Sequence, residues 1–359
     1  MTPGPGRRRP HLPPWQELIS VVIPTFNRAE LVIEALDSVA AQTWRAVEII
    51  VVDDGSTDQT GAALQAWGAA HSGVELRILF QRNRGPEAAR NAGAAAARGA
   101  FLYFLDSDDL ILPDALATLA APLLTGAAPF SLAHIRTADL EGELLQGHES
   151  LSRQSATNCL ASSWMMHAAL YRRSSFIAAG PFDPGFRRGA DTEHQWRVLA
   201  TVGTGALVDR FIGIRRLHDR GHICADRTDA DAARDNVAVM RRFLGWAEAH
   251  GKASFLLRRS LARRAAAAAV RAGRAGDWAC HAEALSILSR ADGWPSFARA
   301  LLALRWTWLH ATLLAVSARL KRLRDRPVPA QAGTAADQAA PAPPARPGVE
   351  RLVPSGGTP

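Results

Sequence analysis

The sequence of 359 residues has little cysteine, and its cysteines do not gather. Cys159, Cys224 and Cys280 are widely spaced and form no CxxC pair. A zinc site or a disulfide framework is therefore not expected, because each needs cysteines at close, repeated spacings. A reducing cytoplasm is the simplest location for such a chain.

Long apolar runs are missing as well. Residues 1–14 are basic, but no apolar segment of the signal-peptide kind follows them. The longest apolar candidate, residues 297–323, is interrupted by Arg305 and Arg319, which leaves only 13 residues between these two charges. A bilayer span needs about 20 apolar residues. We therefore expect neither a secretory signal nor a membrane-spanning helix.

Acidic residues are scarce in the last third of the chain. The net charge is +8, but residues 241–326 hold 17 Lys and Arg against 5 Asp and Glu, a local +12 that leaves −4 (8 − 12) elsewhere. Such a region can be a solvated helical surface, or it can contact an anionic membrane from the cytoplasmic side. Both interpretations stay open, and nucleic acid is not expected as a partner. Residues 297–323 could likewise pack on protein or lie at a membrane interface.

Short apolar runs alternate with amphipathic segments in the first third. We predict strands over 18–26, 47–55, 74–81 and 100–106, and helices over 28–42, 58–70 and 86–98. This alternation predicts an α/β fold with a parallel, doubly wound sheet, in which ligands bind outside the carboxyl ends of the strands. Three of these ends are polar, "PTFN", "DDGSTD" and "DSDD". We expect them to meet at one edge of the sheet.

The second polar cluster places Asp53 and Asp54 before Gly55. A simple strand-to-helix turn, with Asp58 as the N-cap of the next helix, would account for Asp58. It does not account for two adjacent carboxylates. A carboxylate at this place can accept hydrogen bonds from a nucleobase or from a ribose hydroxyl.

The third cluster, in "AFLYFLDSDDLILPDAL", offers Asp106 and Asp108 at a spacing of two residues. Alternate residues of an extended segment point the same way, so both carboxylates could address one site. Sparse carboxylate ligation of this kind suits Mg²⁺ or Mn²⁺ bound with a substrate diphosphate. The alternative is a polar turn capped by acids. We expect Asp109 to support the loop and Asp114 to lie in the first turn of the next helix.

Four ordered stretches, "SVVIPTFNR", "EIIVVDDGSTD", "RNRGPEAARNAG" and "GAFLYFLDSDD", resemble the family 2 glycosyltransferases of GT-A fold. The similarity is close over residues 18–115 and weaker to about residue 225. It implies a doubly wound mixed sheet flanked by helices. It also implies a nucleotide-sugar-binding half over 17–110, an acceptor half over 111–226 and a basic helical extension over 227–325. Residues 1–16 and 326–359 are rich in Pro with Gly or Ala, and we expect them to be disordered.

The resemblance implies a nucleoside-diphosphate sugar as donor, a Mg²⁺ or Mn²⁺ ion and a transfer with inversion. The donor-binding residues implied by the motif match are Pro24, Thr25, Asn27, Asp53, Asp54, Arg90, Asp106 and Ser107. Within this set, Asp54 would contact the base, Asp53 would lie close to the ribose and Arg90 would border the diphosphate. Asp106, Asp108 and His218 form the implied metal site, with Asp108 the main ligand and His222 a competitor of His218.

An inverting transfer also needs a general base for the acceptor hydroxyl. In the family an acidic pair supplies it, and "AAGPFDPGFRRGADTEHQWRVLA" (178–200) matches that segment. The pair falls on Ala190 and Asp191, which makes Asp191 the predicted base and Ala190 a departure from the commoner Glu. Glu193 is the competing candidate. Asp191 could also be a helix N-cap.

The sequence therefore predicts a metal-dependent, inverting glycosyltransferase that acts on a sugar or lipid-linked acceptor in polysaccharide or glycolipid synthesis. A non-catalytic nucleotide-sugar-binding or scaffold protein is the alternative from another class. A sugar nucleotidyltransferase is less favoured, since the first strand ends in "PTFNR" and not in a glycine-rich pyrophosphate loop. A processive synthase is disfavoured because a Gln-x-x-Arg-Trp motif is lacking.

Overall fold

The computed structural model describes residues 17–145, 149–155, 159–186, 188–218 and 228–292. These residues all belong to one unit of the chain, residues 1–311. The segments expected to be disordered, the predicted helix over 297–323 and His222 lie outside the described residues, so those predictions stay predictions.

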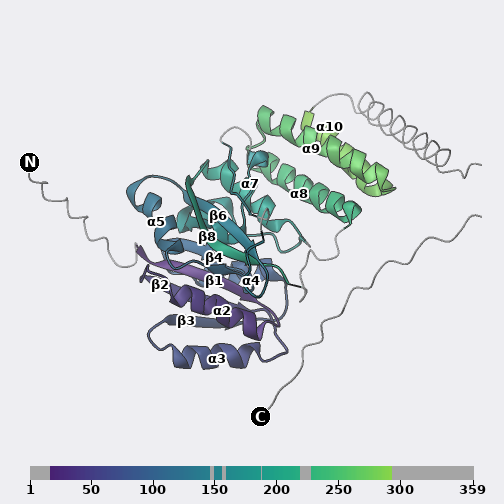
Figure 1. Cartoon of the computed structure of the whole chain (residues 1–359). Helices are drawn as coiled ribbons and strands as arrows, with labels where there is room; N and C mark the ends of the chain where they lie inside the picture. The colour runs from purple at the N-terminus through teal and green to yellow at the C-terminus, as the bar shows by residue number, and fades with distance from the viewer. Residues whose placement is uncertain (1–16, 146–148, 156–158, 187, 219–227, 293–359) are drawn as a thin grey trace, which may run out of the picture. The chain divides into compact units, whose positions relative to one another are not determined.

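The first part of the chain forms the parallel half of a sheet, as predicted (Figure 1). Its strands are β1 (Ile19–Thr25), β2 (Val47–Asp53), β3 (Glu75–Phe80) and β4 (Phe101–Phe104), and its helices are α2 (Ala29–Ala40), α3 (Thr60–Ala70) and α4 (Pro86–Ala96). All seven predicted elements are confirmed, and most differ only in their end residues. β1 is buried along its whole length, which explains its continuous apolar run.

The second part of the chain makes the sheet mixed. It adds β5 (Leu110–Ile111), β6 (Phe130–Ala138), β7 (Ala169–Arg172) and β8 (Ala206–Arg216), and the strand order becomes β3-β2-β1-β4-β7-β6-β8-β5. β7 pairs antiparallel with both β4 and β6, and β5 pairs antiparallel with β8. The mixed sheet expected from the family resemblance is therefore confirmed, whereas a wholly parallel sheet is not.

Helices complete both parts. The sheet part also contains α5 (Ala115–Thr125), α6 (Arg173–Ala179) and α7 (Ala190–Val202), with short 3₁₀ turns at η1 (Cys159–Ala161) and η2 (Met166–Ala168). After residue 227 the described chain is helical, with α8 (Asp229–Ala249), α9 (Phe255–Arg274) and α10 (Trp278–Asp292) packed together beside α7 (Figure 1).

Two helix starts differ from the predictions. Gln59, not Asp58, precedes α3 at the N-cap position, although the Asp58 carboxylate still accepts a hydrogen bond from the Thr60 N–H at 2.9 Å. Asp114 stands at the N-cap position of α5, one residue before the first turn, and forms an ion pair with Arg210 at 2.9 Å. In both cases the acid lies at the amino end of a helix, where its charge is favourable.

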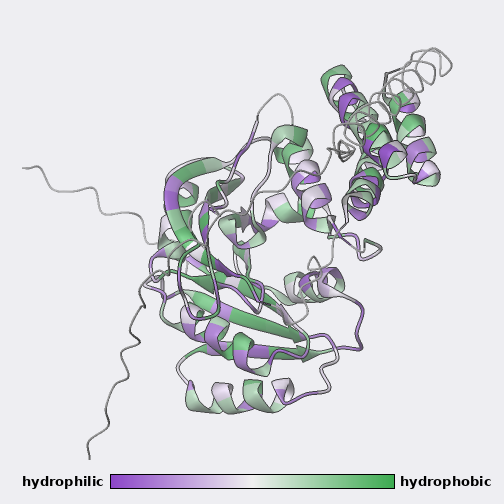
Figure 2. Ribbon diagram, turned by 45° about the vertical axis from the view of Figure 1, so that its right-hand side comes forward, coloured by the Kyte–Doolittle hydropathy of each residue, from purple (hydrophilic) through white to green (hydrophobic). Residues whose placement is uncertain are grey.

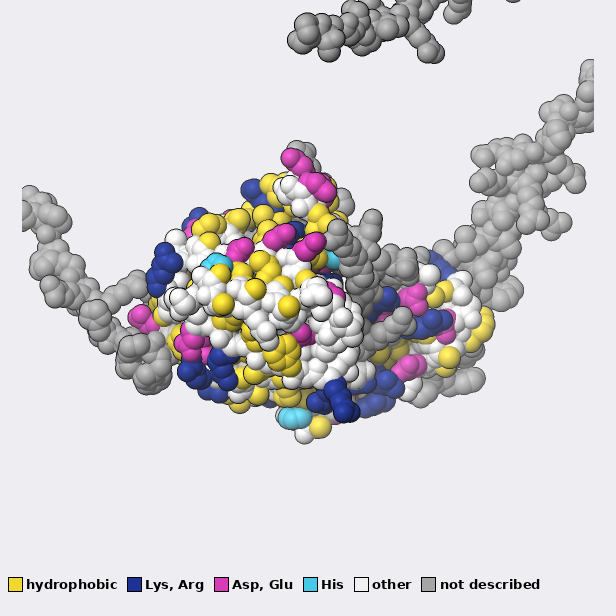
Figure 3. Space-filling view, turned by 90° about the horizontal axis from the view of Figure 1, so that it is seen from below, with side chains coloured by type: hydrophobic (Ala, Val, Ile, Leu, Met, Phe, Trp, Pro, Cys, Tyr) yellow, Lys and Arg dark blue, Asp and Glu magenta, His cyan; other side chains and the backbone are white. Residues whose placement is uncertain are grey.

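Apolar side chains gather in two buried clusters. The larger fills the space between the sheet and its helices, and the smaller joins α7 to α8, α9 and α10. Figure 2 shows the strands mostly in the hydrophobic colour and the helices in both colours. Helix α3 has no charged side chain at all. On the face in Figure 3, seen from the α3 side of Figure 1, hydrophobic and uncharged atoms fill the centre and basic groups lie at the margins.

Candidate active site

The carboxyl ends of β1, β2 and β4 meet at one edge of the sheet, as expected. The register pairs Thr25 with Asp53, and the N–H of Leu105 donates to the carbonyl of Val22 at 3.0 Å. The loops that follow these three strands therefore open on the same edge. Side chains that are far apart in the sequence become neighbours there.

Asp53 and Asp54 are both buried, and their carboxylates hold loops in place. One oxygen of Asp53 accepts from the N–H of Ser56 at 2.8 Å. Asp54 accepts three hydrogen bonds, from the Gln81 amide at 2.7 Å, the Arg84 N–H at 2.9 Å and the Gly85 N–H at 2.8 Å. The second acid therefore orders the loop between β3 and α4, a role that sequence reasoning did not assign to it.

Asn27 ties the end of β1 to the loop after β2. It adopts a left-handed backbone with φ 51°, which Asn tolerates better than most residues. Its N–H donates to the Ser56 hydroxyl at 2.9 Å, and its side-chain oxygen accepts from the Thr57 N–H at 2.8 Å. Pro24 and Thr25 precede it in the buried strand, and among the described residues nothing partners the buried Thr25 hydroxyl. That hydroxyl is a ready hydrogen-bonding group at this edge.

Asp106 pairs with Arg90 of α4. The guanidinium lies 2.5 Å from the carboxylate, and Glu87 lies 3.5 Å from the same guanidinium. Burial alone would raise the pKa of Asp106, but Arg90 outweighs it and holds that pKa below its ordinary value. Asp106 therefore stays ionised at neutral pH. Ser107 follows it as a buried residue.

Asp108 lies among different partners. The same carboxylate oxygen forms an ion pair with Arg28 and lies 3.2 Å from Nε2 of His218. The two acids of the motif are thus close in sequence but are neutralised by separate arginines. The predicted neighbourhood of Asp108 and His218 is present, although 110 residues separate them.

Asp109 holds the loop after β4 in place, as expected. It accepts from the Arg216 N–H at 3.0 Å and lies 3.1 Å from Nδ1 of the buried His167. Burial, together with Asp108 and Asp106, raises the pKa of Asp109 well above its ordinary value, and burial lowers the pKa of His167 to about 4. Burial thus favours the neutral form of both groups.

Asp191 is the second residue of α7, and its charge acts on Arg90 together with that of Asp106. Gly189, with φ 84°, is the N-cap residue, so the N-cap alternative for Asp191 is wrong. Burial raises the pKa of Glu87, and the charges of Asp191 and Asp106 add to that shift, so both acids act on the same side chain. Ala190 is buried in the apolar cluster that joins α7 to α8, α9 and α10, a place that suits a small apolar side chain better than a Glu.

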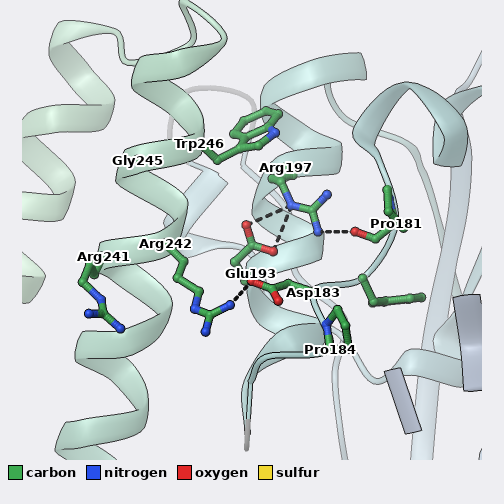
Figure 4. A pocket seen from close by; sticks show the side chains of 10 residues that line it. Pro181, Asp183, Pro184, Glu193, Arg197, Arg241, Arg242, Gly245 and Trp246 are labelled. Carbon is green, nitrogen blue, oxygen red and sulfur yellow. Dashed lines mark hydrogen bonds and ion pairs between the residues drawn. The ribbon is translucent and has the colours of Figure 1, made fainter. Parts of the chain in front are cut away.

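Glu193 is engaged elsewhere. Both its oxygens lie 2.9 Å from Nε of Arg197, whose other nitrogens donate to the carbonyls of Ala179 and Pro181 at 2.6 and 2.8 Å. Figure 4 shows this pair beside a cavity of about 560 Å³, which Trp246 of α8 also lines. Burial raises the pKa of Glu193 although Arg197 opposes it. A carboxylate held by its own arginine is poorly placed to receive a proton from an acceptor.

Three residues of the site were not predicted from the sequence. Arg28 contacts Asp108, His167 lies under Asp109, and Arg216 donates to the Asp108 carbonyl at 2.5 Å while pairing with Glu34. Arg28 follows directly on the quoted "PTFN", and Arg216 stands two residues before His218. Charge at these positions was a visible signal, but the partners are distant in sequence.

The donor atoms near Asp108 fit a sparsely held divalent cation. Within the part of the chain that the structure describes, no group of three or more His, Cys, Asp and Glu side chains forms a metal cage. Asp108 and His218 together offer one carboxylate and one imidazole at one point. Mg²⁺ and Mn²⁺ are often held by one or two protein groups with the substrate phosphates, so this pair suits such an ion. Over the same described residues, no helix has the length and apolarity to cross a bilayer.

Comparisons with known proteins bear on this architecture. The model of "Glycosyl transferase family 2" matches residues 20–178. The glycosyltransferase GlyG of Streptococcus pneumoniae is 39% identical over 104 residues, 29% of this chain and 34% of that protein. The succinoglycan biosynthesis protein ExoO of Rhizobium meliloti is 36% identical over 129 residues, 36% of each chain. The chain thus spans about a third of the length of these relatives.

Solved structures show the same fold. Residues 1–349 of S. aureus TarS, in complex with UDP-GlcNAc, align with a TM-score of 0.55 and 23% identity, covering 68% of this chain and 72% of that one. The predicted GT-A fold is therefore confirmed. The family model spans β1 to β7 and the loops that carry Asp54, Asp106 and Asp108, so residues 20–178 of this chain are similar to the family 2 glycosyltransferases.

Proposed function

We propose that this protein transfers a sugar from a nucleoside-diphosphate sugar to an acceptor hydroxyl, with a divalent cation and with inversion at the anomeric carbon. The observation that carries the proposal is the grouping at the sheet edge. Asp106 with Arg90, and Asp108 with Arg28 and His218, lie where the loops of three strands meet. Glycosyl transfer to a hydroxyl needs such a charged corner for the leaving diphosphate.

The donor nucleotide occupies the loops after β1 and β2. Asn27 joins these two loops by a hydrogen bond, and Asp54 joins the second of them to the β3–α4 loop, so the edge that receives the nucleotide is preformed. We assign the base to Asp54 and the ribose to Asp53, with Pro24 and Thr25 beside them. TarS, which has the same fold, is described in complex with UDP-GlcNAc, and this supports a nucleotide sugar as the donor class.

The diphosphate lies between Arg90 and the Asp108–His218 pair. A divalent cation held by Asp108 and His218, with Asp106 near it, would neutralise charge on the diphosphate. Arg90 is buried, and Asp106 and Glu87 outweigh the lowering effect of that burial and raise its pKa. It therefore keeps its positive charge beside the leaving group. Arg28 adds a second cation to the same corner.

Asp191 accepts the proton. As the acceptor oxygen attacks the anomeric carbon, its proton passes to the Asp191 carboxylate, and the bond from that carbon to the diphosphate oxygen breaks on the opposite face. Attack and departure on opposite faces invert the stereochemistry. Glu193 is disfavoured for this role because Arg197 holds both its oxygens.

The acceptor is a sugar or lipid-linked sugar of a cell-surface polysaccharide or glycolipid. The similarity to ExoO, which is named for succinoglycan biosynthesis, supports this class. We place the protein in the cytoplasm, with its basic C-terminal helices against a membrane surface.

Exchange of Asp191 for Asn tests the chemistry. Sugar nucleotides carrying UDP, GDP or dTDP are first screened with Mn²⁺ by thermal shift, since a bound ligand raises the apparent stability. With the donor that binds, Asp191→Asn should keep donor affinity and lose about 10²- to 10⁴-fold in the rate of nucleoside-diphosphate release. Glu193→Gln is the matched control. Near-normal turnover of Asp191→Asn would place the base elsewhere.

A further inference from the structure

Helix α9 is the most basic element of the described chain. Its 20 residues carry six arginines and no acid, at positions 258, 259, 263, 264, 271 and 274. The helix dipole favours cations only in the last turn, which accounts for Arg271 and Arg274. The four nearer its amino end need another explanation.

The acids around α9 already form ion pairs, in most cases with arginines of other helices. Glu248 pairs with Arg258 and Arg290, Glu283 with Arg241, and Asp277 with Arg234. Arg264 donates to the Leu160 carbonyl and lies over the Trp196 ring at 5.4 Å. These contacts hold the helices together and link α9 to the sheet part.

Four arginines of α9 remain outside this network. Arg259, Arg263, Arg271 and Arg274 are exposed, and among the described residues none of them has an ion-pair partner. At about 100° per residue, Arg259, Arg263 and Arg274 lie within about 60° around the helix, and Arg271 lies about 60° further round. The opposite side of α9 is a buried row of alanines and leucines. The unpaired charges therefore form one outward face.

Two large apolar side chains lie on the same face, at the amino end of the helix. Phe255 is 71% exposed and Leu256 is 55% exposed. On the helical wheel Leu256 lines up with Arg263 and Arg274, and Phe255 lies next to Arg259. An exposed aromatic and an exposed aliphatic side chain beside a row of arginines form the pattern of a helix that lies on a lipid surface.

We propose that this face of α9, defined by Phe255, Leu256, Arg259, Arg263, Arg271 and Arg274, docks the protein on an anionic bilayer, an inference that rests on the membrane placement in the proposed function and assigns it a surface. The arginines meet the phosphates of the head groups, and Phe255 and Leu256 enter the boundary of the acyl chains. Charge complementarity selects an anionic surface, and the exposed aliphatic Leu256 favours lipid over single-stranded nucleic acid, whose bases stack on aromatic rings.

Vesicle binding by the full chain tests the proposal. The probes are vesicles of phosphatidylcholine alone and of phosphatidylcholine with phosphatidylglycerol, at low and high salt. We expect binding only to the anionic vesicles, weakened by salt. Arg259→Gln with Arg263→Gln should weaken that binding about 30-fold, at about one kcal/mol per arginine near an anionic surface. Leu256→Ser should reduce the fraction of binding that survives high salt.

The control removes the same charge elsewhere. Arg45 and Arg153 are exposed arginines of the sheet part, so Arg45→Gln with Arg153→Gln should leave vesicle binding unchanged. Equal melting temperatures of both double variants show that folding is intact. The proposal is overturned if the wild-type protein does not bind anionic vesicles, or if the α9 double variant binds them as the wild type does. Tighter binding of single-stranded poly-U RNA than of vesicles, lost in the α9 variant, overturns the choice of lipid.

Discussion

The sheet part and the three-helix part of this protein use charge in opposite ways. Around the sheet, several charged side chains are buried and pair with residues far away in the sequence. Glu48 is fully buried and accepts from Ser20 and Arg98, and Arg216 joins β8 to the Asp108 loop. In α8 to α10 most ion pairs lie at the surface, as Arg241 with Glu283 does. Buried pairs of the sheet part hold the loops of the candidate site in place, whereas the ion pairs of the helical part lie in contact with solvent.

Loss of the Asp108 carboxylate should give the largest effect. Asp108→Ala removes the group that Arg28 and His218 share. Calorimetric titration of the nucleoside diphosphate in the presence of Mn²⁺ should then lose its metal-dependent part. Asp114→Ala is the control, because it removes an acid of the same stretch whose partners are the exposed Arg210 and the Thr118 hydroxyl. Unchanged metal-dependent binding in Asp108→Ala would rule out its role at the metal.

Matched ion pairs test the contrast directly. Arg197→Met leaves Glu193 buried without a partner, which should lower the free energy of unfolding by about 3–5 kcal/mol. Arg290→Met removes one partner of the half-exposed Glu248, which Arg258 still contacts, and should cost less than about 1 kcal/mol. Urea denaturation measures both. Equal losses would mean that the two parts do not differ in this respect.

A buried histidine of the sheet part should make the free energy of unfolding depend on pH. His194 packs against Phe182 with ring centroids 4.3 Å apart, and burial, aided by Arg197, lowers its pKa well below the ordinary value. Below about pH 6.5 the unfolded chain takes up a proton that the folded chain does not, so stability falls as the pH falls. The slope from this group approaches about 1.4 kcal/mol per pH unit.

The comparison of wild type with His194→Gln isolates that slope. Urea melts between pH 7 and pH 5 should show a steeper loss for the wild type, since the other buried histidines contribute equally to both proteins. Parallel curves would mean that His194 takes up its proton in the folded state as readily as in the unfolded state.

The features that could be predicted from the sequence depend on patterns among neighbouring residues. The strands from Ile19 to Phe104 and the helices between them follow from apolar runs and their spacing, and the loops after β1, β2 and β4 follow from a motif order. Motif likeness also placed His218 near Asp108. These inferences need only residues close in sequence or a family pattern.

What could not be predicted depends on distant partners. Arg216 meets Glu34 across 182 residues, and no local signal pairs them. The three hydrogen bonds that bind Asp54 to the β3–α4 loop depend on how that loop closes. β7 is four residues long, and its antiparallel place between β4 and β6 is set by the chain that comes before and after it.

Two helical glycines give the smallest and sharpest test of the contrast. At Gly93 of α4 an added methyl group would overlap the Val22 side chain of β1, whereas at Gly245 of α8 it would meet nothing within 4 Å. Gly93→Ala should therefore destabilise the protein by about 1–3 kcal/mol through overpacking. Gly245→Ala should stabilise it by about 0.5–1 kcal/mol, because alanine loses less backbone entropy than glycine in a helix. Thermal melts of the two variants should shift in opposite directions, and a shift of the same sign in both would show that the face of α8 at Gly245 is as closely packed as the sheet.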